Sequence, residues 1–396
     1  MHTKYHVGLH ILFDDESSNT LCSSIKTSKS NHLVSAYLSG ETNRIPVDPL
    51  YNVVVNNKGV RHSPFTLPDL TNGTQKDAVL IPVDNTDRFI SVWCSDAISS
   101  RFRIYMRSHQ LNDVGKLVSQ GLTIQVSQSY GDYVGPKAIY ITERNQVIVS
   151  WLSVDSKNIH IKAFKLKEDG NFEEDSYEFM TSGSFLSDEY FNRNLDLSRD
   201  TERSISFIRA GKLNIFMGNV NNNGIGIYSV DVANGNIFFS SLANYERQNI
   251  GCFNAIYDVT KLAIKIVFSA ISGNGNVDIL GDNIRLFGLN NPRGMAVPLN
   301  ERKAVCSSPS IANIGESGNF VVAWQTSNGP IYFNEFDSDY SIVGDETSIN
   351  DERDTIKPSV VVTSNQTAIV FSSRAYQGKP LSDYGVLYFV ADHESY

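Results

Sequence analysis

The sequence predicts an all-β fold: a seven-bladed β-propeller of four-stranded antiparallel blades, with its ring closed by the N-terminal strand. An apolar run, a polar turn and a second apolar run that ends in an aromatic residue recur seven times along the 396 residues. A third apolar run follows each pair, and almost no segment has the 3.6-residue period of an amphipathic helix. Repetition of such units around an axis is the architecture of a propeller.

The aromatic residue that ends each second run marks one register of the repeat. Successive aromatics lie 47 to 65 residues apart, and all three tryptophans of the chain fall in this register. Because each aromatic ends a central strand, we expect these side chains to pack between blades rather than to bind a ligand. The aromatics are Tyr37, Trp93, Trp151, Phe216, Phe268, Trp324 and Phe371.

Composition and turn residues define the strands of each unit. The runs are rich in Val, Ile, Phe, Tyr and Ser, and their lengths suit strands. Short polar turns such as SKSN, DNTD and ESG join the first two runs, as in hairpins. Less regular fourth segments include LTIQVSQ, NIFFSSL and ETSIND. The third runs are LYNVVV, FRIYMRS, IHIKAFKL, GIGIYSVDV, NIRLFGL, IYFNEF and GVLYFVA.

We interpret residues 1–396 as a single domain. The last unit supplies three strands, and residues 5–13 form a strand that belongs to no other unit, so we expect this strand to complete the last blade. Two stacked β-sandwiches are the alternative, but they would not predict one sevenfold register. The predicted blades span residues 20–68, 76–128, 136–181, 202–244, 252–300, 307–350, and 357–392 together with 4–14.

One unit resembles known repeats. It begins SPSIANIGESGNFVVAW, with a proline, an apolar strand, a glycine and the VVAW run, and its next strand ends in FD. This pattern resembles the propeller repeats of bacterial adhesins, lectins and toxin components, most clearly over residues 307–372. The resemblance concerns blade architecture and includes no catalytic motif, so it implies a role in binding.

Charge and hydropathy restrict the partners and the compartment. A formal net charge of -9 argues against nucleic acid as a partner. No apolar run approaches the ~18 residues of a membrane helix, so we expect no membrane insertion. The N-terminus lacks the features of a secretory signal. We therefore expect a cytoplasmic protein or one released by a non-classical route, and leave its oligomeric state open.

We predict no cofactor and no metal site. The four cysteines form no CxxC pair and are expected to be buried or half-buried thiols. His6 and His10 would share one face of a strand, but no third metal ligand is visible. The segments Asn219–Gly224 and Asp337–Asp339 lack the acidic pattern of a calcium loop, and we interpret them as turns. P-loop, GxSxG and HExxH motifs are absent.

A propeller glycosidase is the enzymatic alternative, and it usually needs two carboxylates that face a common pocket. The predicted innermost strands contain one acid, Asp258, near the far end of its strand. Asp77 lies just before another of these strands, and Lys137 lies just before a third. Sialidase-type Asp boxes are missing, so we lean against catalysis. Loop carboxylates such as Asp132 or Asp188 keep the enzymatic alternative open.

The predicted ligand site is formed by the loops that join strand four to the next strand one, and strand two to strand three, because these loops emerge on the same face of a propeller. They are rich in aromatic and polar residues, which together suit sugars or the hot spots of protein interfaces. For any single tyrosine, burial between blades is the alternative. The long loop at residues 182–201 is expected to fold over this face. The candidate ligand-binding residues are Tyr130, Asp132, Tyr133, Asp188, Tyr190, Arg193, Tyr245, Arg247, Arg374 and Tyr376.

The sequence therefore predicts a non-catalytic recognition module that binds a glycan or the surface of a host or partner protein, as a bacterial lectin, adhesin or toxin component does. The first alternative is a glycan-acting enzyme with loop-borne carboxylates. The second is an intracellular scaffold that docks another protein on the face of the ring. The scarcity of acids on the predicted innermost strands favours the recognition module over the enzyme.

Overall fold

The structure is a computed structural model of the chain. The described residues are 8–13, 18–40, 50–66, 73–98, 101–128, 130–156, 158–180, 205–210, 214–221, 224–233, 237–245, 249–271, 277–285, 296–300, 305–327, 329–349, 355–362, 366–374 and 384–392.

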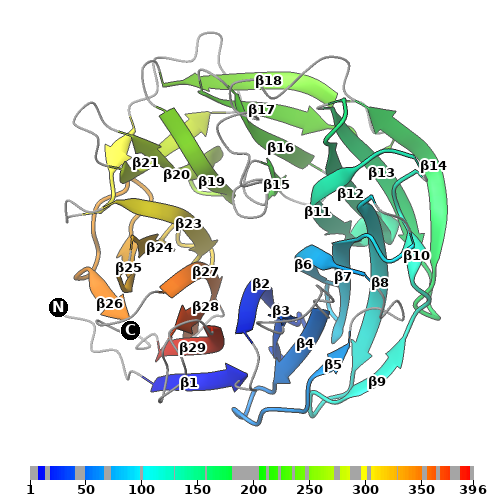
Figure 1. The fold of residues 1–396 in the computed structure, drawn as a ribbon. Coiled ribbons are helices and arrows are strands. Elements are labelled where there is room, and N and C mark those ends of the chain that lie inside the picture. The colour runs from blue at the N-terminus through cyan, green and yellow to red at the C-terminus, as the bar shows by residue number, and fades with distance from the viewer. Residues whose placement is uncertain are drawn as a thin grey trace.

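Strands in the described part of the chain form seven antiparallel sheets arranged around a common axis (Figure 1). Within each sheet consecutive strands pair as neighbours, as a meander of hairpins requires. This arrangement confirms a β-propeller built of four-stranded antiparallel blades. We number the sheets from first to seventh in the order in which their innermost strands occur along the chain. The innermost strands are β2 (Ser18–Lys26), β6 (Gln75–Pro82), β11 (Tyr133–Ile141), β15 (Ile205–Ala210), β19 (Asn249–Asp258), β23 (Cys306–Asn313) and β27 (Thr355–Val362).

The second and third strands of each sheet lie between its innermost and outermost strands. The second strands are β3 (Leu33–Gly40), β7 (Arg88–Ser95), β12 (Gln146–Ser153), β16 (Asn214–Asn221), β20 (Ala263–Ile271), β24 (Phe320–Thr326) and β28 (Gln366–Arg374). The third strands are β4 (Leu50–Val55), β8 (Arg103–Leu111), β13 (Ile159–Leu166), β17 (Gly224–Val230), β21 (Val277–Arg285), β25 (Ile331–Phe336) and β29 (Tyr384–Asp392).

The outermost strands are the least regular. In the second sheet this strand is split into two short pieces that both pair with β8. In the seventh sheet the outermost strand is β1, which pairs with β29 from Gly8↔Val390 to Phe13↔Val386. The first and last strands of the chain thus share one sheet. The outermost strands are β5 (Phe65–Thr66), β9 (Leu117–Gln120) with β10 (Ile124–Gln125), β14 (Phe172–Met180), β18 (Ile237–Asn244), β22 (Val297–Pro298), β26 (Thr347–Ile349) and β1 (Gly8–Phe13).

One third strand begins earlier than the sequence pattern predicts. The run NIRLFGL starts at Asn283, whereas β21 starts at Val277 and pairs with β20 along nine residues. Gly281 interrupts the apolar pattern in this strand. A Cβ added at this glycine would overlap the ring of Tyr340, which comes from the sixth sheet. The glycine therefore permits close approach of the neighbouring sheet instead of ending the strand.

Apolar side chains gather between neighbouring sheets. Trp93 packs with Val34 and Val54 of the preceding sheet, and Trp324 packs with Val267 in the same way. The predicted packing role of the register aromatics is thereby confirmed, while the side chain of Phe216 lies outside the described residues. The thiols of Cys94, Cys252 and Cys306 are buried and that of Cys22 is partly buried, as expected. The buried register aromatics are Tyr37, Trp93, Trp151, Phe268, Trp324 and Phe371.

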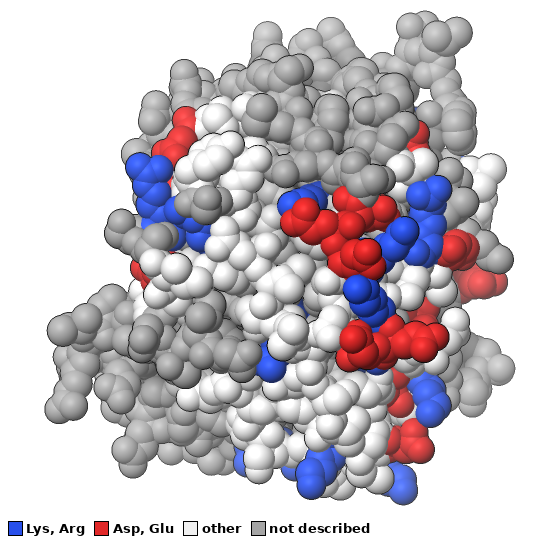
Figure 2. All heavy atoms as spheres, turned by 90° about the vertical axis from the view of Figure 1, so that its right-hand side faces the viewer, with Lys and Arg blue, Asp and Glu red and all other residues white. Residues whose placement is uncertain are grey.

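The outer surface of the third sheet carries charges of both signs. Lys162 pairs with Glu174 at 2.9 Å, and Lys167 pairs with Glu173 at 3.3 Å. Figure 2, which views this side of the ring, shows acidic and basic side chains interspersed rather than gathered into a patch of one sign. None of the helices in the placed part of the chain has the length and apolar character to cross a membrane.

Candidate ligand-binding site on the entrance face

A β-bulge recurs near the start of the innermost strands, at the side of the ring called here the entrance face. In β6 the pairing skips from Lys76 to Val79, and in β11 it skips from Val134 to Lys137. Two residues of the inner strand therefore oppose a single residue of the second strand, which bends the strand and redirects its side chains. Four further sheets have a skip in the innermost strand, at Leu21/Ser23, Ile250/Phe253, Ser307/Ser310 and Ile356/Ser359.

The first bulge residue has a left-handed backbone in three of these strands. Its φ angle is 52° at Asp77, 61° at Gly135 and 53° at Ser308. Asp and Gly accept this conformation more readily than most residues, which accounts for their presence at the position. The bulge of β6 therefore places an aspartate within the innermost strand. The sequence pattern predicted that this strand starts at residue 78 and left Asp77 outside it.

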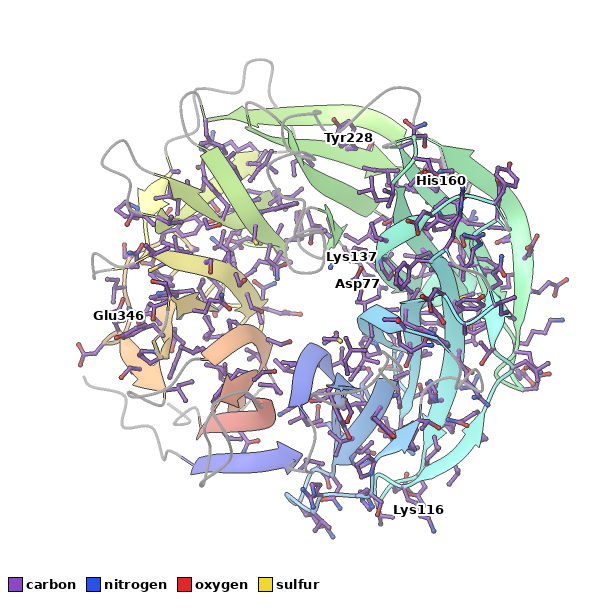
Figure 3. The ribbon with its side chains drawn as sticks, viewed as in Figure 1. Asp77, Lys116, Lys137, His160, Tyr228 and Glu346 are labelled. Atoms are coloured by element: carbon purple, nitrogen blue, oxygen red, sulfur yellow. The ribbon has the colours of Figure 1, made fainter. Side chains whose placement is uncertain are left out.

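Three neighbouring inner strands enclose a pocket of about 80 Å³ at these bulges. Figure 3 shows Asp77 and Lys137 beside each other on the inner side of the ring, next to the axis. Both polar and apolar groups line the pocket wall, as in many sites for small ligands. The lining residues are Cys22, Ser23, Asp77, Ala78, Val79, Gly135, Pro136 and Lys137.

Asp77 is held firmly in the wall of this axial pocket. Its residue surface is 4% exposed. Carboxylate Oδ2 accepts a hydrogen bond from the backbone N–H of Gly135 at 3.3 Å and one from the Cys94 thiol at 3.8 Å. The bond to Gly135 crosses to the third sheet, so Asp77 both joins two blades and fixes its own orientation.

Lys137 occupies a register position that serine fills in three other sheets, at Ser23, Ser310 and Ser359. The Ser23 hydroxyl accepts a hydrogen bond from Leu80 N at 3.2 Å, and Ser310 accepts one from Val360 N at 3.0 Å. Each of these bonds joins an inner strand to the next inner strand of the ring. Lysine has no acceptor and cannot make this bond. The third sheet therefore has a charged donor where the first and sixth sheets have a structural acceptor.

Tyr130 stands out from the loop that leads into β11 and is 71% exposed. The Tyr133 hydroxyl donates to the Tyr130 carbonyl at 2.6 Å, and Arg103 Nη1 donates to the carbonyl of Gly131. Asp132 Oδ1 accepts from Phe102 N at 2.9 Å. These bonds hold the loop against the preceding sheet, so an exposed aromatic ring is presented from a fixed backbone.

The structure separates the other predicted ligand residues. Tyr133 is buried at 3% exposure, and its ring meets the Trp151 ring edge to face. Tyr245 is 4% exposed and donates its hydroxyl to Asp282 Oδ2 at 2.9 Å. Burial and then the neighbouring Asp282 carboxylate raise the pKa of Tyr245 far above its ordinary value. Both tyrosine side chains are therefore buried and stabilise the packing of the sheets. That they contact a ligand stays a prediction.

Several predicted ligand residues lie outside the described residues, or have side chains that are not described. Arg374 ends β28 opposite Tyr384, and its side chain is not among those described. The predicted covering loop at 182–201 also lies outside the described residues, and its role stays a prediction. The same holds for the candidate residues Asp188, Tyr190, Arg193, Arg247 and Tyr376.

The acid at the far end of β19 belongs to a buried ion pair. Asp258 Oδ2 lies 2.8 Å from Lys265 Nζ, and both side chains are 0% exposed. Lys265 also donates to the Ser338 carbonyl of the sixth sheet at 2.6 Å, and it lies 4.9 Å from the centre of the Phe320 ring. Asp258 Oδ1 accepts from Thr260 N at 2.8 Å. These contacts join the fifth and sixth sheets and occupy both oxygens of the carboxylate.

No protein-family model matches the chain, and no curated protein matches it. Solved structures share its fold at low sequence identity. The Trypanosoma rangeli sialidase in complex with the inhibitor DANA aligns over 97% of this chain with a TM-score of 0.52 and 8% identity. The same sialidase in complex with sialic acid aligns over 98%, with a TM-score of 0.50 and 10% identity. The chain spans 59% of the length of either sialidase chain. The Dos1 propeller aligns over 96% of this chain and 94% of its own, with a TM-score of 0.49 and 10% identity.

Proposed function

We propose that this protein is a non-catalytic, lectin-like recognition module that binds a glycan on the entrance face of the propeller. The observation that carries the proposal is the exposed Tyr130 ring, on the loop that leads into β11, a strand that lines the axial pocket. An aromatic face that stays in water and is fixed by its backbone can stack on a sugar ring at a low cost in entropy. The resemblance of residues 307–372 to lectin and adhesin repeats agrees with this role.

The distribution of carboxylates supports binding rather than glycosidic catalysis. A glycosidase needs two carboxyl groups on either side of the scissile bond. Among the described residues that line the axial pocket, Asp77 is the one carboxylate. Asp258 is committed to Lys265, and Asp132 accepts from the backbone of Phe102. A sialidase bound to sialic acid is among the structures that share the fold, which agrees with a glycan as ligand and leaves its identity open.

We further infer that the seven sheets act as the blades of one closed, single-domain ring. The pairing of β1 with β29 supports this inference, because it completes the seventh sheet with the first strand of the chain. The side chains of Tyr37 and Val53 also pack with Val361 and Val370, so the first and seventh sheets share an apolar cluster. Such a ring would hold the entrance loops in fixed positions relative to one another.

Binding to a glycan array, combined with an assay for released sugar, tests the proposal. We expect the protein to bind at least one class of glycan without releasing sugar. Tyr130→Ala should weaken that binding by about tenfold or more, because a stacked aromatic supplies much of the contact. Leu122→Ala is the matched control, since Leu122 is 69% exposed on the outer part of the second sheet. Unchanged binding by Tyr130→Ala, or release of sugar by the wild type, would refute the proposal.

A further inference from the structure

We propose that the axial pocket is a subsite for neighbouring hydroxyl groups of a neutral sugar, which Asp77 and Lys137 bind together. The inference rests on the proposed glycan recognition and names the ligand chemistry of the axial part of that face. The two side chains come from adjacent inner strands and line the same hollow (Figure 3). Each is placed by a bulge at the entrance to its strand.

The repeat provides an internal comparison for these two positions. At the first bulge residue, where the second sheet has Asp77, the third and sixth sheets have Gly135 and Ser308. At the residue after the bulge, where the third sheet has Lys137, the sixth sheet has Ser310. The sixth sheet thus forms a blade of the same form without a charge at either position, whereas the seventh sheet has Lys357 at the first of them. Asp77 bonds to the third sheet, but the bulge itself does not require an acid beside a base, which points to a role in binding.

The chemistry of the pair suits hydroxyl groups. A sugar hydroxyl can donate a hydrogen bond to the Asp77 carboxylate and accept one from the Lys137 ammonium group. The two opposite charges leave the pair with no net charge, so it offers no excess attraction to an anionic sugar. Ala78, Val79 and Pro136 supply apolar wall beside the pair, where the C–H groups of a sugar ring can pack.

The volume of the pocket limits what it can hold. About 80 Å³ is well below the roughly 300–1,000 Å³ of a pocket that encloses a drug-sized ligand. It is several times the ~10–15 Å³ that one water molecule needs. We therefore infer that one edge of a terminal sugar ring enters the pocket while the rest of the ring remains outside it.

Two substitutions test the subsite without removing its packing. Lys137→Met keeps the aliphatic stem and removes the ammonium group, while Asp77→Asn keeps an oxygen for the N–H of Gly135 and removes the charge. Lys116→Met is the control, because Lys116 is exposed at the outer edge of the ring, far from the axis (Figure 3). The probes are the methyl glycosides of glucose, galactose and mannose, together with free sialic acid. Binding is measured by saturation-transfer NMR and calorimetric titration.

The wild type and Lys116→Met should bind at least one methyl glycoside, and more tightly than sialic acid. Lys137→Met and Asp77→Asn should each lose about tenfold to a hundredfold in affinity, the usual effect of losing a hydrogen bond to a charged group. Melting temperatures should show that both variants are folded. If Asp77→Asn does not fold, the affinity of Lys137→Met alone tests the subsite. Unchanged affinity in Lys137→Met, or a preference for sialic acid, overturns the inference. If the wild type binds array glycans but none of the methyl glycosides, the subsite is refuted while the proposed function stands.

Discussion

Replacing Lys265 by methionine should be among the most damaging single changes to stability. The substitution leaves the Asp258 carboxylate in the interior without the ammonium group that lies 2.8 Å from it. Breaking a buried pair by removing one partner costs about 3–5 kcal/mol. Lys265 also donates to the Ser338 carbonyl and lies over the Phe320 ring, so contacts with the sixth sheet are lost as well.

Urea unfolding, followed by tryptophan fluorescence, measures this cost against a matched surface pair. Lys29 lies 3.0 Å from Asp113, and their side chains are 59% and 83% exposed. Solvent screens an exposed pair, so it contributes little to stability, and Lys29→Met should change the free energy of unfolding little. If Lys265→Met costs no more than Lys29→Met, the reasoning from burial is refuted.

The pair also has an expected double-mutant result and pH dependence. The double variant Lys265→Met/Asp258→Asn should cost less than the sum of the two single changes, because no unpaired charge then remains. Burial alone would raise the pKa of Asp258, but hydrogen bonds from Lys265 and Thr260 outweigh it and hold the pKa below its ordinary value. The stabilisation is therefore present above about pH 4 and is lost as the pH falls through the folded-state pKa.

Three further outcomes are expected. Trp324→Ala should cost about 3–5 kcal/mol in urea unfolding, because the side chain is 1% exposed between two sheets, and loss of glycan binding with intact stability would contradict this packing role. Burial lowers the pKa of His109 to about 3. Below about pH 6.5, His109 therefore binds a proton in the unfolded chain but stays neutral in the folded chain. Stability should fall by about 1.4 kcal/mol per pH unit from this group alone, and His109→Gln should lessen that fall in unfolding curves recorded between pH 6.5 and 4. Deletion of residues 1–14 should expose the edge of β29, lower the melting temperature and promote aggregation, whereas an unchanged melting temperature would refute a closing role for β1.

Local patterning predicted the regular strands well. The runs LYNVVV, IHIKAFKL and IYFNEF are β4, β13 and β25 residue for residue. These runs are rich in β-branched and aromatic residues and are bounded by turns, so their limits depend on short-range preferences. The start of β21 could not be predicted in this way, because Gly281 interrupts the apolar pattern. This glycine is needed where the Tyr340 ring of the next sheet lies close to the strand.

The site was only partly predictable, because exposure depends on neighbouring sheets. Tyr130 and Tyr133 belong to one loop and look equivalent in the sequence, yet one ring is 71% exposed and the other 3%. The difference arises because Tyr133 packs against Trp151 and His160. Asp77 and Lys137 could be recognised as charges near the starts of inner strands. Their convergence on one pocket depends on bulges in both strands, which the sequence pattern did not reveal.

The placement of apolar clusters between sheets has a consequence for how substitutions combine. Trp93 belongs to a cluster between the first and second sheets, whereas Trp324 belongs to one between the fifth and sixth. No cluster of the described residues contains both, so their stability losses should add with little coupling. Over evolutionary time each interface can then change its side chains through compensating substitutions of its own. The entrance loops of one pair of blades can diversify toward a new ligand while the distant interfaces keep their residues.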